Sequence, residues 1–235
     1  MENASEWKAK LALVCYIVLF IGLLMASVVV SFVLLGMRID YLDLPFPFAF
    51  ISIPVNESVI VGVTLLFANH KGAGLKELGL KKVSLRIWAT VSVAAVFLYL
   101  TGLSISIGEE IVFGPDPVGE LFAKLVMPRD SFQLIVMIFL SLVLVAPPCE
   151  ELAFRGFIQK GFENSFGKTK GLLIASVLFG LFHGLNTLYA IVPAFAAGLI
   201  LGYVWQRTGG NTTASALMHG MNNSISFALA YFLTA

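Results

Sequence analysis

The sequence predicts an all-α protein, a polytopic transmembrane helix bundle of about seven spans that encloses a polar intramembrane cavity. Of its 235 residues, 58% are hydrophobic and only 12% are charged, whereas soluble domains carry about 25% charged residues. The mean hydropathy is +0.91. A chain of this length has too little interior to hide so much apolar surface, which excludes a soluble enzyme, and disorder would require the opposite composition.

The net charge, the lack of repeats and the positions of the cysteines further restrict the class of protein. The formal net charge is +1, so the chain lacks the basic surface that nucleic-acid binding requires. No repeat, low-complexity tract or shift in composition divides the chain, and we expect residues 1–235 to form a single integral membrane domain. Cys15 and Cys149 lie within apolar runs, where buried thiols are expected rather than a disulfide framework.

The spans follow from the apolar runs, because a helix needs about 20 apolar residues to cross the hydrocarbon core. The expected spans cover residues 11–37, 46–69, 87–107, 131–161, 172–189, 191–206 and 213–233. The first run exceeds the apolar region of a signal peptide, about 7–15 residues, so we expect it to be retained. The fifth and sixth runs are nearly continuous, which leaves six or eight spans as alternatives.

The connectors between the runs alternate in charge. Residues 70–86 and 155–170 are rich in Lys and Arg, whereas residues 108–131 hold mostly Asp and Glu. The positive-inside rule then predicts a cell-membrane protein with a cytoplasmic N-terminus. Residues 74–86 are expected to form an amphipathic stretch at the inner surface, with Leu78 among the leucines that face lipid.

Charged residues in the fourth run require an explanation, because a charge at mid-bilayer costs at least about 2.5–3.5 kcal/mol. Two prolines at positions 147–148 should interrupt the helix just before Glu150 and Glu151. Glu151 and Arg155 are four residues apart, in the favourable order for an ion pair. Glu150 points about 100° away and stays unpaired, which suits a general base. A purely structural or interfacial Glu–Glu–Arg cluster is the alternative.

Two of the three histidines also lie in predicted spans. His183 shares a helical face with Phe179, and His219 shares one with Asn223, because each pair is four residues apart. A single intramembrane His usually bonds a neighbouring helix, but two of them with an unpaired Glu and an Asn favour a site. Small residues nearby would let these helices approach closely: Gly180, Gly184, Gly198, Gly202 and Gly220.

Three motifs on successive apolar runs complete the pattern: Glu-Glu-x-x-x-Arg at 150–155, Phe-x-x-x-His at 179–183 and His-x-x-x-Asn at 219–223. Together they resemble the CPBP family of intramembrane proteases. That family includes the type II CAAX prenyl endopeptidases and bacterial relatives linked to bacteriocin processing and self-immunity. The resemblance covers approximately residues 130–230, the expected protease core.

The resemblance implies a role for each matching position. Glu150 and His183 would hold and activate a water, and His219 and Asn223 would donate to the developing oxyanion. Supporting positions would be Glu151, Arg155 and Phe179. Peptide hydrolysis does require a base for water and fixed donors where negative charge develops, so the chemistry of the residues agrees with these roles.

The role of a metal stays open at this stage, because the family is often described as metalloproteases. Glu150, His183 and His219 could offer zinc the nitrogen and oxygen atoms it accepts. However, the chain has no His-Glu-x-x-His motif, and an Asn such as Asn223 is a poor zinc ligand. The favoured mechanism therefore requires no cofactor and assigns no metal ligand, with zinc as the alternative.

The expected function is endoproteolysis of a membrane-associated peptide or protein, either prenylated or a small exported peptide. One alternative is a non-enzymatic scaffold or bacteriocin self-immunity protein that retains the polar core for stability. Another is a small transporter or proton relay that uses the buried Glu and His residues. The lack of a visible inverted repeat weakens the transporter, since many transporters have one.

Overall fold

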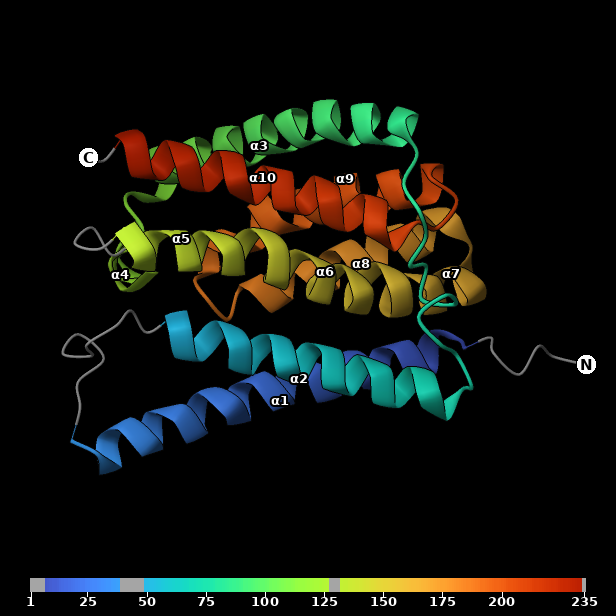
Figure 1. Ribbon diagram of the computed structural model, residues 1–235, viewed down its shortest axis with the longest axis horizontal. Coiled ribbons are helices and arrows are strands. Elements are labelled where there is room, and N and C mark those ends of the chain that lie inside the picture. Colours follow the sequence, from blue (N-terminus) through green and yellow to red (C-terminus); the bar gives the residue numbers. More distant parts are fainter. Residues whose placement is uncertain (1–6, 39–48, 127–131, 234–235) are drawn as a thin grey trace, which may run out of the picture.

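The computed structural model describes residues 7–38, 49–126 and 132–233, and every regular element in these ranges is helical. The predicted all-α class is therefore confirmed. The long helices run back and forth along one axis, so that α10 ends at the opposite end of the molecule from the start of α1 (Figure 1). The predicted starts of two spans, at residues 46 and 131, lie outside the described residues.

The elements follow one another in a simple order. The α-helices are α1 (Ala9–Gly36), α2 (Ala49–His70), α3 (Leu85–Phe113), α4 (Pro117–Val126), α5 (Phe132–Leu140), α6 (Ala146–Glu151), α7 (Lys160–Phe166), α8 (Lys168–His183), α9 (Ile191–Arg207) and α10 (Thr212–Leu233). Two π-helical segments, η2 (Ser141–Val145) and η3 (Leu152–Gln159), join α5, α6 and α7 into one path. A short 3₁₀ turn, η4 (Leu188–Ala190), precedes α9.

Five of these segments are long and apolar enough to cross a membrane, by length and composition among the described residues. They cover Ala9–Gly36, Ser52–His70, Leu85–Phe113, Ile135–Phe166 and Leu188–Arg207. The other two predicted spans correspond to α8, which has only 16 residues, and to α10. Both helices pack within the same bundle. The protein is therefore an integral membrane protein, and the number of seven spans stays a prediction.

The fifth predicted span ends earlier than the sequence suggested. We expected it to reach residue 189, but α8 ends at His183, and a turn leads into η4. The hydroxyl of Thr187 accepts a hydrogen bond from the Tyr189 amide and so caps η4, a local bond that competes with helix continuation. As a result His183 is the last residue of α8 rather than an interior one.

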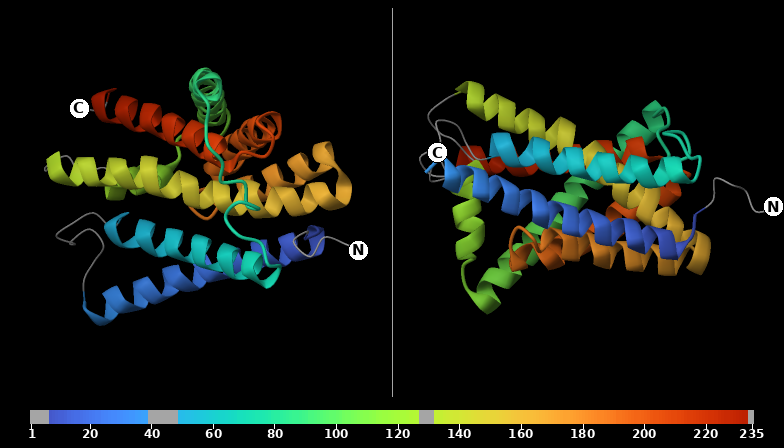
Figure 2. Two further views of the ribbon diagram at one scale, coloured as in Figure 1. Left: turned by 45° about the vertical axis from the view of Figure 1, so that its right-hand side comes forward. Right: turned by 90° about the horizontal axis from the view of Figure 1, so that it is seen from below.

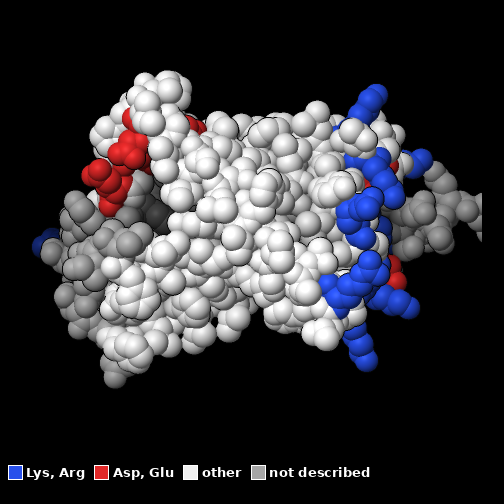
Figure 3. Space-filling view, turned by 90° about the horizontal axis from the view of Figure 1, so that it is seen from above, with Lys and Arg blue, Asp and Glu red and all other residues white. Residues whose placement is uncertain are grey.

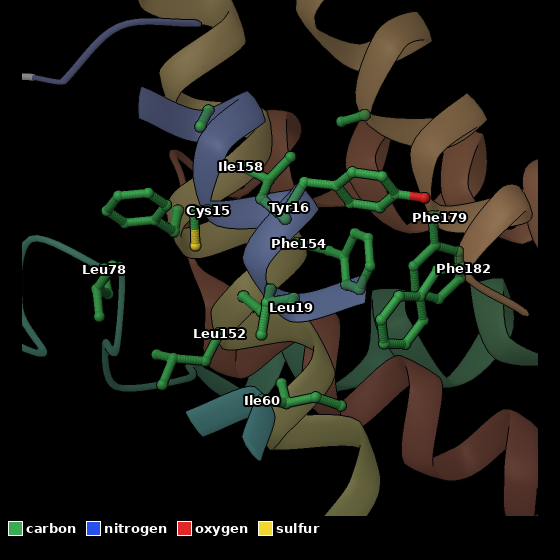
Figure 4. Packing of buried hydrophobic residues seen from close by; sticks show 14 of the residues in the cluster. Cys15, Tyr16, Leu19, Ile60, Leu78, Leu152, Phe154, Ile158, Phe179 and Phe182 are labelled. Carbon is green, nitrogen blue, oxygen red and sulfur yellow. The ribbon is translucent and has the colours of Figure 1, made fainter. Parts of the chain in front are cut away.

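The broken helical path α5–α7 and helix α8 lie between two other layers. Helices α1 and α2 cover one side, and α3, α9 and α10 cover the other (Figures 1 and 2). Phe154 is fully buried where α1, α8 and η3 meet, with ring centroids 4.9 Å from Phe179, 5.0 Å from Phe182 and 6.4 Å from Tyr16 (Figure 4). This aromatic cluster fixes η3 against α8 beside the candidate site.

Glycines bring the helices close together, as predicted. A Cβ atom at Gly220 would lie 2.7 Å from the carbonyl oxygen of Val143, and one at Gly198 would lie 2.9 Å from Cα of Ser176. A Cβ at Gly180 would lie 2.7 Å from the carbonyl oxygen of Ile191. Only glycine allows these approaches, which set α10 against η2 and α8 against α9.

Charge is segregated along the bundle axis. Lys and Arg side chains gather at one end, which includes the start of α3, and Asp and Glu side chains gather at the other, near the junction of α3 and α4 (Figure 3). The expected lipid contact of Leu78 is wrong, because this side chain is fully buried. Residues 75–79 form turns instead of a helix. Gly79, at φ +85°, packs so closely on Gly210 that a Cβ would lie 2.5 Å from its carbonyl oxygen.

Candidate active site

The helix that carries the two acids is interrupted, as the prolines predicted. Pro147 and Pro148 stand in the first turn of α6, which is only six residues long and has a π-helical segment on each side. Proline lacks an amide N–H and cannot continue the hydrogen-bond ladder of the preceding turn, and π segments often occur at functional sites. Adjacent residues of a helix point about 100° apart, so Glu150 and Glu151, both in α6, face different sides of it.

Glu151 is fully buried at the centre of a polar cluster. Its Oε2 atom lies 3.1 Å from Nε of Arg155, which is the predicted intrahelical ion pair, and it accepts a hydrogen bond of 2.5 Å from the Ser215 hydroxyl. Its Oε1 atom lies 3.1 Å from Nδ1 of His219. A buried carboxylate is stable only with such partners, so Glu151 links η3 to α10 and fixes the His219 ring.

Glu150 and His183 form a second pair. Oε2 of Glu150 lies 3.7 Å from Nε2 of His183, and this oxygen has no hydrogen-bond partner among the described residues. Nδ1 of His183 lies 2.9 Å from the carbonyl oxygen of Phe179, to which it donates. That bond selects the tautomer with a lone pair on Nε2. Two acceptors 3.7 Å apart can then bind the same water molecule.

Phe179 separates the two pairs and touches both. Its ring centroid lies 4.4 Å from that of His183 and 6.2 Å from that of His219. The guanidinium of Arg155 lies 4.3 Å from the same ring, in the geometry of a cation–π contact. The ring therefore holds the two imidazoles at a fixed spacing.

Asn223 is tied to the broken helix. Its Nδ2 atom donates to the carbonyl oxygen of Leu142, in η2, at 3.0 Å, and its Oδ1 atom accepts from Nδ2 of Asn222 at 3.2 Å. The Leu142 carbonyl is available for this contact, because the Ala146 amide donates to Ser141 and Pro147 has no amide N–H. The amide of Asn223 thus has a fixed orientation and one N–H still to donate.

A cavity of about 570 Å³ extends from the histidines and Asn223 of this site to the acidic end of the bundle. His183, His219 and Asn223 line its inner part, and Glu109, Glu110 and Asp116 line the part near the junction of α3 and α4. Its walls come from α3, α8, α9 and α10 and are largely apolar. The cavity is large enough for a short stretch of peptide.

The donor arrangement does not fit a zinc site. Among the described residues, no group of three His, Cys, Asp or Glu side chains is placed to hold one metal ion. Nδ1 of His219 is already occupied by Glu151, and Nε2 of His183 lies 3.7 Å from Glu150. Since structural and catalytic zinc need at least three protein ligands, we derive no step through a metal.

The sequence predicts most residues of this site, but it does not predict three of them. The Ser215 hydroxyl donates to Glu151, and no pattern in the sequence indicates this contact. Asn222 contacts the neighbouring Asn223, and it lines the cavity. Glu57, within the second predicted span, lies beside Glu150 and Cys149, close enough to interact with both. Only the rarity of charged residues in a span could have singled it out.

Together these features define a helical membrane protein with a buried site of paired acids and imidazoles, an arrangement suited to hydrolysis. Residues 132–225 match the family model described as Type II CAAX prenyl endopeptidase Rce1-like. The match contains all three motifs and confirms the resemblance to the CPBP intramembrane proteases, so this part of the chain is similar to the Rce1-like domain. No curated protein and no solved structure was found to match the chain.

Proposed function

We propose that the protein is an intramembrane endopeptidase that hydrolyses a peptide bond by means of a glutamate-activated water. The observation that carries this proposal is the pairing of Glu150 with Nε2 of His183 at 3.7 Å. Both atoms are acceptors and converge on one position, where a water would give its hydrogens to them. A positioned base of this kind contributes about 10²–10⁴-fold to the rate.

The reaction needs only the substrate and water. The water oxygen forms a bond to the scissile carbonyl carbon while Glu150 takes a proton from the water. When the tetrahedral intermediate collapses, the carbon–nitrogen bond breaks and Glu150 gives the proton to the leaving amine. Water has then been split between the two new termini, and Glu150 is a carboxylate again.

His219 and Asn223 are placed to stabilise the oxyanion of that intermediate. Glu151 accepts from Nδ1 of His219 at 3.1 Å, and this buried carboxylate favours a second proton on the ring, which Nε2 would donate toward the cavity. Asn223 has one amide N–H left for the same oxygen after its bond to Leu142. Such donors are each worth about 2.7–4 kcal/mol when they are fixed before the reaction.

The position of the cavity supports one class of substrate. The cavity extends to the acidic end of the bundle, and the positive-inside rule assigns the opposite, basic end to the cytoplasm. This orientation, with the N-terminus in the cytoplasm of a cell-membrane protein, favours a peptide that enters from the outer side. We therefore propose a membrane-inserted or small exported peptide over a prenylated cytoplasmic C-terminus.

The experiment is cleavage of a mixed peptide library by the protein in proteoliposomes, read by mass spectrometry. Glu150→Gln should lose about 10²–10⁴-fold in rate, because Gln cannot take up the proton. Glu120→Gln, which changes an exposed carboxylate on α4, is the matched control and should cleave like the wild type. Full cleavage by Glu150→Gln would refute the proposal. A cellular phenotype that survives this substitution would instead favour a non-enzymatic scaffold.

A further inference from the structure

A second cavity lies next to the candidate site, on the side of α1 and α2. It has a volume of about 250 Å³, and Glu150 lines this cavity rather than the larger one. His183 lines both cavities and so stands at their junction. Several further polar side chains line the smaller cavity, namely Ser27, Ser52, Asn56, Glu57 and Asn186.

Glu57 is the most unusual member of this lining. It comes from α2, is only 8% exposed, and its Oε2 atom has no hydrogen-bond partner among the described residues. The other polar contact of its carboxylate is the Cys149 thiol, a weak donor. Oε2 of Glu150 is unpartnered in the same way. Two buried acids, from different helices, thus line one small cavity, and each has an enclosed oxygen with no hydrogen-bond partner among the described residues.

Such oxygens are costly unless a donor reaches them. The cavity of about 250 Å³ far exceeds the space of about 10–15 Å³ that one water centre needs, and it offers each water several polar partners. Apolar cavities stay dry, but this one has carboxyl, amide and hydroxyl groups among its apolar lining, which water can bind. Waters held between Glu57 and Glu150 would supply donors to both side chains.

We propose that this smaller cavity, the water chamber, supplies the hydrolytic water to Glu150, and that Glu57 is the positioning residue that holds it there. The inference rests on the proposed function. A peptide in the larger cavity covers the side that faces His219 and Asn223, so water must reach the Glu150–His183 pair from elsewhere. The water chamber reaches that pair from the side of α1 and α2.

The kinetic test compares two substitutions of Glu57 with similar volumes. Glu57→Gln keeps a polar end that can bind water and should retain at least about a third of the wild-type kcat. Glu57→Leu makes this wall of the chamber apolar, and it should lower kcat by about tenfold or more with KM unchanged. Since Leu also removes a buried oxygen without a hydrogen-bond partner, the melting temperature should not fall, which separates this effect from misfolding.

A second readout needs no activity. Asn56→Cys, with Cys149→Ser, places a thiol in the wall of the chamber, and a small water-soluble methanethiosulfonate reports its contact with water. We expect modification at least about tenfold faster than at Cys15, which is fully buried and serves as the internal control. A thiol at position 56 that reacts as slowly as Cys15 would overturn the proposal.

The outcomes separate the two proposals. Activity in Glu150→Gln would remove the proposed function itself. If Glu150→Gln is inactive while Glu57→Leu keeps its full kcat, only the role of Glu57 fails. Equal loss in Glu57→Gln and Glu57→Leu would also overturn that role, because it would show that the charge is required and not a group that binds water.

Discussion

Nδ1 of His219 lies 3.1 Å from Oε1 of Glu151, although 68 residues separate them and they belong to α10 and α6. The carboxylate also contacts Arg155 and Ser215, and it is fully buried. One acid therefore neutralises a buried guanidinium and orients an imidazole from another helix. This relationship makes the orientation of His219 dependent on the charge of Glu151.

We predict that Glu151→Gln lowers both activity and stability. Misplacing a functional group by about 1 Å can cost about 10²-fold in rate, and leaving Arg155 buried without its counter-ion costs about 3–5 kcal/mol. Peptide cleavage and thermal denaturation in the same detergent measure the two effects. Ser215→Ala removes one hydrogen bond but keeps the ion pair, so its losses should be clearly smaller. Equal effects in the two variants would argue against the ion pair as the organising contact.

These contacts show where prediction from sequence worked and where it stopped. The pairs Glu151–Arg155 and Phe179–His183 lie four residues apart on one helix, and helical geometry brings them together. The contact between Glu151 and His219 joins distant helices. No local rule assigns a particular acid to a particular imidazole across helices, and the same holds for the Ser215 hydroxyl.

Helix α10 should tolerate no side chain at Gly220. A Cβ there would lie 2.7 Å from the backbone carbonyl of Val143, which cannot rotate away. We expect Gly220→Ala to destabilise the protein by about 1–3 kcal/mol, the usual range for overpacking, and to lower activity by moving His219. Gly62→Ala is the matched control, because nothing lies within 4 Å of a Cβ at that position. Denaturation midpoints that are the same in the two variants would contradict this account.

Treatment with metal chelators should leave peptide cleavage unchanged. The described residues offer no cluster of three metal-ligating side chains, and the proposed chemistry uses Glu150 and His183 to activate water directly. The measurement is the cleavage rate after incubation with EDTA and with 1,10-phenanthroline, followed by zinc addition. A rate that falls with chelator and returns with zinc would show that a metal takes part, and the mechanism would have to change.

The limits of the helices were harder to predict than their existence. Hydropathy located the spans because it depends on composition over about 20 residues. Hydropathy extended the predicted fifth span past His183. In the structure, Gly184 ends α8 and the capping hydroxyl of Thr187 starts η4. Likewise, the apolar pattern of residues 74–86 assigned Leu78 to lipid, whereas a turn at Gly79 buries it. Local backbone geometry decided both cases.

The last prediction concerns Asp116, at the acidic end of the substrate cavity and outside the spans. Desolvation acts to raise the pKa of this carboxyl, but hydrogen bonds from the Gly119 amide, the Thr187 hydroxyl and the Val118 amide hold it below its usual value. The Thr187 bond, 2.7 Å long, ties the turn after α8 to the start of α4.

Because the pKa of Asp116 is lower in the folded protein than in the unfolded chain, the carboxylate adds stability that is fully present above its unfolded pKa of about 4. That contribution is lost as the pH falls through the lower, folded pKa. Asp116→Asn still caps α4, since Asn is a good N-cap residue, but it does not titrate. Its melting temperature should therefore depend less on pH between about 5 and 2 than that of the wild type, with Glu120→Gln as control. If the melting temperatures of the wild type and of Asp116→Asn change equally with pH over this interval, the link to Thr187 does not depend on the charge of Asp116.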